Sequence, residues 1–95
     1  MFIIYLKFST NRSMASDHMA RHNTWIEQGF ADGVFQCMGS LKAEGGGAIV
    51  AIRETRTELE ARVAADPFVE HDVVKAEITE VEVKRTASEL ELLKE

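Results

Sequence analysis

The sequence predicts an α+β fold in which two helices cover one face of a four-stranded sheet. Apolar residues alternate in steps of two over residues 2–8, and they recur in steps of three or four over residues 13–32. The predicted elements follow the order strand, helix, strand, strand, helix, strand. With 95 residues and 45% hydrophobic content, the chain is long enough for one core and too short for two. We therefore expect a single domain spanning residues 1–95.

The first three strands flank one long helix and one hairpin. The first strand is predicted over Phe2–Phe8. Polar residues at 9–13 then predict an N-cap for the long helix, and Gly33 ends it. Val34–Leu41 and Ala48–Arg53 are predicted as strands joined by a loop with three consecutive glycines.

Two helix starts follow the third strand. Thr55 and Glu58 have the spacing of a capping box, which predicts a second helix ending near Ala65. Asp66 and Pro67 then form an N-cap with proline at the first helical position, which predicts one further short turn.

The last strand is predicted over about 73–84. Its apolar residues change parity midway, which predicts a bulge near Thr79 or Glu80 because one extra residue moves the following side chains to the other face. Residues 86–95 are predicted as a short tail helix capped by Thr86 and Glu89.

The first strand is apolar on both faces: one face carries Phe2, Ile4, Leu6 and Phe8, and the other carries Ile3 and Tyr5. Two helices cover only one face of a four-stranded sheet. The other face is apolar and uncovered, so we expect a homodimer whose two sheets pack face to face. Cys37, in the second strand, is expected to be a small buried hydrophobe.

Charge and composition argue against several partners and locations. The net charge is −5, and lysines and arginines do not cluster, so neither nucleic acid nor an anionic membrane is an expected partner. No apolar run is long enough to span a membrane. One cysteine forms no disulfide framework. The default expectation is a cytoplasmic protein.

His22 lies on the apolar stripe of the long helix, three residues after Met19 and four before Ile26. A buried imidazole must hydrogen-bond at least one ring nitrogen. The helix therefore carries either a satisfied core histidine or a titratable group that lines a pocket.

At this point the chain resembles the YciI-like (YCII-related) proteins of the dimeric α+β barrel superfamily. The resemblance covers roughly residues 1–83. It rests on the first strand, on His22 placed eleven residues before Gly33, on the run Val34–Gly39, on the glycine-rich loop and on Asp66-Pro67-Phe68-Val69.

This resemblance implies a ferredoxin-like fold with an antiparallel sheet and a dimeric barrel. It also implies an active site centred on a histidine and an aspartate, which correspond to His22 and Asp66. One departure is Ser40, which stands where the family usually has the proline of a Gly-Pro pair.

Three further residues are candidate substrate-binding groups. Trp25 is placed to stack on a flat ligand, Arg12 to pair with a substrate carboxylate, and Ser40 to form part of the pocket wall. Each also has a structural alternative, as a packing residue, a solvated charge or a strand residue. His18 has metal-ligand spacing from His22, but the sequence offers no clear third ligand, so no metal site is expected.

The favoured function is an enzyme of isomerase or lyase type that acts on a small molecule without an organic cofactor. His22 would move a proton, and Asp66 would orient its ring. Asp66 has an alternative role as a helix cap alone. The alternative function is a non-catalytic dimer that binds a metabolite or regulates another protein through the same cavity.

Overall fold

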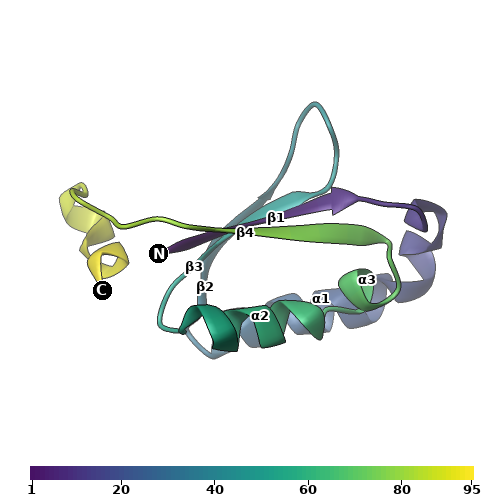
Figure 1. Cartoon of the computed structure of the whole chain (residues 1–95), viewed down its shortest axis with the longest axis horizontal. Coiled ribbons are helices and arrows are strands. Elements are labelled where there is room, and N and C mark those ends of the chain that lie inside the picture. Colours follow the sequence, from purple (N-terminus) through teal and green to yellow (C-terminus); the bar gives the residue numbers. More distant parts are fainter.

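Four antiparallel strands form one sheet in the computed structural model, which describes residues 1–95 (Figure 1). In chain order they are β1 (Phe2–Phe8), β2 (Phe35–Ser40), β3 (Gly47–Ala51) and β4 (Val74–Glu80). In space the order is β2-β3-β1-β4, so the first strand lies in the middle. The predicted α+β ferredoxin-like fold is confirmed.

The helices α1 (Ala15–Ala31), α2 (Arg56–Ala64) and α3 (Pro67–Glu70) lie together on one face of the sheet (Figure 1). The core lies between these two layers. Its largest contributions come from the inward-facing strand residues and from α2 and α3: Phe2, Ile4, Leu6, Phe35, Ile49, Leu59, Val63, Phe68 and Val74. No helix combines the length and the apolar composition needed to cross a bilayer.

No helix covers the opposite face of the sheet, which we call the open face (Figure 1). The strand register places Ile3 of β1 opposite Val50 of β3, and Tyr5 opposite Ala48. These side chains are half-buried. Cys37 is exposed, so the expectation of a buried cysteine was wrong. It is paired with Val50 in the register, and paired residues of adjacent strands project from the same face.

Strand β4 ends at Glu80 and carries no bulge, contrary to the sequence prediction. Its register with β1 is regular from Val74, opposite Phe8, to Glu80, opposite Phe2. β1 begins at Phe2, and beyond Glu80 only Val81 is still hydrogen-bonded across, to Met1, so the later parity change lies outside β4. The irregularity lies in β2 instead, between Phe35 and Cys37.

The tail forms a kinked 3₁₀ helix, η2 (Ser88–Lys94), rather than a capped α-helix. Its N-cap is Ala87, without a side-chain hydrogen bond, so the predicted Thr86–Glu89 capping box does not form.

The start of α1 also differs from the prediction. A 3₁₀ turn, η1 (Arg12–Met14), leads into the helix, and Met14 is an N-cap without a side-chain hydrogen bond. The Asn11 amide instead donates to the backbone oxygen of His71, 2.9 Å away. Gly33 ends the helix as predicted, with a positive φ of 74° that suits glycine.

Arg62 ties the end of α1 to α2. Its guanidinium hydrogen-bonds Glu54 at 2.8 and 3.2 Å and pairs with Asp32 at 3.0 Å. The hydrogen bonds to Glu54, together with those to Asp32, raise the pKa of Arg62. The predicted capping box of α2 is confirmed: Glu58 N–H donates to the Thr55 hydroxyl, and Thr55 N–H donates to the Glu58 carboxylate at 2.9 Å.

This capping box predicts an acid-sensitive stability. The hydrogen bond from the Thr55 backbone, followed by that from its side chain, lowers the pKa of Glu58 below its ordinary value of 4.5. A depressed folded-state pKa means that the unfolded chain binds the proton first, so the stabilisation is complete above 4.5 and is lost as the pH falls through the folded value. We expect Glu58→Gln to flatten the slope of unfolding free energy against pH below 4.5, measured by urea titration. A slope equal to that of the wild type would contradict this role.

Candidate active site

His22 and Asp66 form a buried hydrogen-bonded pair. His22 projects inward from α1 and is 8% exposed, while Asp66 is completely buried at the start of α3. The distance from His22 Nδ1 to Asp66 Oδ1 is 2.7 Å. A carboxylate only accepts hydrogen bonds, so Nδ1 carries the proton and donates it. The sequence predicted both residues, and the structure brings them together across 44 positions of the chain.

Asp66 holds the histidine and caps α3 through the same oxygen. Oδ1 also accepts the backbone N–H of Phe68 at 3.0 Å, as expected for an N-cap followed by Pro67. The second oxygen, Oδ2, is buried without a hydrogen-bond partner in the protein. Capping and orienting are therefore not alternatives for Asp66, because one atom performs both.

Phe68 holds the imidazole from one face. The two rings are 3.9 Å apart between centroids and 4° from parallel. Phe68 thus contributes its backbone to Asp66 and its ring to His22. In the sequence, Phe68 was recognised only as part of the motif Asp66-Pro67-Phe68-Val69. Its position two residues after Asp66, at the N2 position of a capped turn, is the signal that could have placed it in the site.

The second ring nitrogen of His22 lies at a cavity. Nε2 has no hydrogen-bond partner in the protein and is not among its fully buried unpartnered atoms. His22 lines a cavity of about 350 Å³ between α1 and the sheet. The other lining residues are mostly apolar, with glycines from the β2–β3 loop: Leu6, Phe8, Met19, Asn23, Ile26, Met38, Gly39, Ser40, Gly45, Gly46, Gly47, Ile49, Phe68 and Val74.

The three predicted binding residues take different places. Ser40 lines this cavity. Arg12 does not line it, but its guanidinium lies 4.2 Å from the centroid of the Phe8 ring, which does. Arg12 therefore lies beside one residue of the cavity wall and not in the lining.

Trp25 lies outside the cavity lining and packs between helices. Its indole N–H donates to the backbone oxygen of Arg62 at 2.9 Å, and its ring meets Phe35 edge-on. Trp25 follows His22 by three residues, which turns it toward α2. Trp25 thus makes the packing contacts of its alternative role, and its ring also lies 5.9 Å from that of His22, 23° from parallel.

His18 belongs to a separate contact at the surface. Its ring stacks on His71 with centroids 4.1 Å apart, and its Nδ1 lies 2.9 Å from an Arg21 nitrogen. His18 does not line the cavity and is not part of the His22–Asp66 pair.

Comparisons with known proteins agree with this architecture. The chain matches the family model of the YCII-related domain over residues 1–86. It is also similar to the solved structure of 5-chloro-2-hydroxyhydroquinone dehydrochlorinase from Burkholderia phenoliruptrix AC1100, in complex with 2,5-dihydroxybenzoquinone. That similarity has a TM-score of 0.69 at 17% identity and covers 88% of this chain and 96% of the other. No curated protein sequence matches the chain.

The shared oxygen of Asp66 predicts different costs for two substitutions. Asp66→Asn keeps an oxygen for the cap and for Nδ1 but places its amide NH2 where Oδ2 is buried without a partner, so the unfolding free energy should fall by about 1–3 kcal/mol. Asp66→Ala removes the cap, worth about 1 kcal/mol, and leaves Nδ1–H buried and unpaired, at about 1–3 kcal/mol. Denaturant unfolding of both variants checks this, and equal losses would contradict the shared role.

Proposed function

This chain belongs to the YCII-related family, and we propose that it is an enzyme that moves protons on a small molecule, with His22 as the acid–base group. The observation that carries the proposal is the buried 2.7 Å hydrogen bond from His22 Nδ1 to Asp66, in a ring whose Nε2 is left without a protein partner. Asp66 does not line the cavity, so it serves as a positioning residue.

The chemistry follows from the tautomer. With the proton on Nδ1, neutral His22 presents an unshared electron pair at Nε2, which can accept a proton from a C–H or O–H group of a bound molecule. The carboxylate of Asp66 then stabilises the imidazolium that forms. The electron pair left on the substrate forms a double bond or expels a leaving group, and Nε2 returns its proton at another atom. Isomerase and lyase reactions of this type need no organic cofactor.

The cavity supports a small, largely apolar substrate with a few polar substituents. Its volume of about 350 Å³ lies at the lower end of the range for small-molecule sites, roughly 300–1,000 Å³. Asn23 and Ser40 supply hydrogen-bonding side chains within it, and the Arg12 guanidinium lies against Phe8 of its wall. The dehydrochlorinase with the similar fold binds 2,5-dihydroxybenzoquinone, a hydroxylated six-membered ring. We propose hydroxylated small rings as the substrate class of this chain.

We also propose that two chains pair through their open faces. The half-buried Ile3, Tyr5 and Val50 form an apolar stripe there that no element of the same chain covers. Apolar faces of this kind mark association surfaces, and aligned packing of two sheets is a common way to bury them.

Proton transfer by His22 can be tested before the physiological substrate is identified. Hydroxylated six-membered ring compounds are incubated with the protein in deuterated water, and NMR follows deuterium entering their C–H positions. His22→Gln should lower protein-dependent exchange by about 10²- to 10⁴-fold while retaining ligand affinity within a few-fold. His18→Gln, one helical turn away and outside the cavity, is the matched control. Ligands that bind without protein-dependent exchange would instead support a non-catalytic binding protein.

Pairing through the open face predicts a dimer at micromolar concentration in analytical ultracentrifugation. Val50→Lys places a charge within the apolar stripe and should shift the protein to monomers with an unchanged far-ultraviolet circular dichroism spectrum. Glu27→Lys, on the exposed side of α1, should remain dimeric. A wild-type monomer, or a Val50→Lys dimer as tight as the wild type, would contradict the proposal.

A further inference from the structure

The C-terminal segment, residues 81–95, is set apart from the domain that carries the site; we call it the tail. Directly after β4, two hydrogen bonds between Met1 and Val81 join the tail to the start of the chain. The family match ends at residue 86. Figure 1 shows the tail projecting beyond the end of the sheet, away from α1 and α3.

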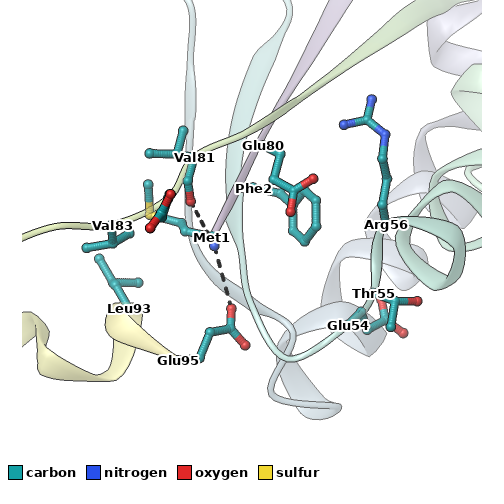
Figure 2. A pocket seen from close by; sticks show the side chains of 11 residues that line it. Met1, Phe2, Glu54, Thr55, Arg56, Glu80, Val81, Val83, Leu93 and Glu95 are labelled. Atoms are coloured by element: carbon teal, nitrogen blue, oxygen red, sulfur yellow. Dashed lines mark hydrogen bonds and ion pairs between the residues drawn. The ribbon is translucent and has the colours of Figure 1, made fainter.

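The tail packs incompletely on its own chain. A hollow of about 970 Å³ lies between it and the start of α2, and Figure 2 shows Leu93 and Glu95 on one side and Thr55 and Arg56 on the other. Glu95 closes the far end, where its carboxylate accepts the Arg53 N–H at 2.6 Å and lies 3.7 Å from the N-terminal amine. Protein interiors are normally close-packed, so this contact does not bury the tail.

The tail presents apolar side chains and one free carboxylate to solvent. Leu90 is 49% exposed and Leu92 is 44% exposed, and no large hydrophobic residue of the chain is more exposed than Leu90. Glu91 pairs with Lys94, whereas Glu89 has no ion-pair partner. The segment therefore combines exposed leucines with an unpaired negative charge.

A complementary surface lies at the other end of β4, on the open face. Lys75 stands directly opposite Lys7 of β1, and like charges in that arrangement are destabilising. The charge of Lys7 is compensated by an ion pair with Glu77 at 3.5 Å, whereas Lys75 has no carboxylate partner. The apolar stripe of the open face begins next to them at Tyr5, so an unpaired positive charge borders apolar surface.

We propose that the tail of one chain docks at the lysine end of the open face of a second copy, with its leucines beside the Tyr5 end of the apolar stripe and Glu89 facing Lys75. This inference rests on the proposed pairing of open faces and specifies its orientation. The tail and Lys75 lie at opposite ends of β4, which is about 23 Å long for seven residues. When the two-fold axis runs across the strands, the tail end of each copy lies at the lysine end of the other, so both tails dock alike.

A charge exchange tests this contact in the full-length chain. Glu89→Lys and Lys75→Glu should each weaken the dimer about 10-fold in sedimentation equilibrium, because two symmetry-related pairs are lost. The double variant restores opposite charges and should regain most of that affinity. Glu27→Lys, with the same change in net charge on α1, should have no effect. Leu90→Ser with Leu92→Ser should weaken the dimer without any change in charge.

Two results would overturn the tail contact. One is a Glu89→Lys dimer as tight as that of Glu27→Lys, and the other is a double variant no tighter than the single variants. In either case, a dimer that Val50→Lys still disrupts leaves the pairing of open faces intact. A wild-type monomer would overturn both interfaces, and none of these outcomes bears on proton transfer by His22.

Discussion

The burial of one carboxylate, that of Asp66, is the constraint on which the candidate site depends. A charged group without contact with solvent must be compensated by hydrogen bonds or by an opposite charge. Asp66 receives one hydrogen bond from the backbone of α3 and one from His22 on α1. The same requirement therefore begins α3, joins it to α1 and determines which nitrogen of the imidazole carries the proton.

The surrounding packing converts this constraint into a usable geometry. The Phe68 ring covers one face of the imidazole, and Trp25 and Arg62 fix α1 against α2. The histidine thus has little freedom to rotate, and its Nε2 is left at the edge of the cavity between α1 and the sheet. Preorganisation of this kind is what proton transfer by a side chain requires.

Much of this arrangement could be predicted because it depends on local patterns. Alternation in β1, helical periodicity through Met19 and His22, and the caps at Thr55 and Asp66 each follow from a few neighbouring residues. The partnership of His22 with Asp66 came from the family resemblance, since no local pattern joins residues so far apart. The errors arose where tertiary contacts determine the end of an element. β4 ends where β1 offers no strand partner. At the start of α1, Asn11 hydrogen-bonds His71 instead of capping the helix.

Side-chain directions were the hardest to predict. Trp25 has the spacing of a pocket residue, but its indole N–H donates to the backbone oxygen of Arg62, at the end of α2. Cys37 lies in an apolar strand, but it projects to the face that no helix covers. In both cases the direction of the side chain depends on where other elements of the fold lie, which the local sequence does not show.

The most direct test of the account is nitrogen-15 NMR of the His22 ring in mildly alkaline solution, where a free imidazole is neutral. We expect Nδ1 to carry the proton of the neutral ring, in a strong hydrogen bond that Asp66→Ala abolishes, and Nε2 to carry none. A neutral ring that carries its proton on Nε2 and not on Nδ1 in the wild-type protein would contradict the role proposed for the pair.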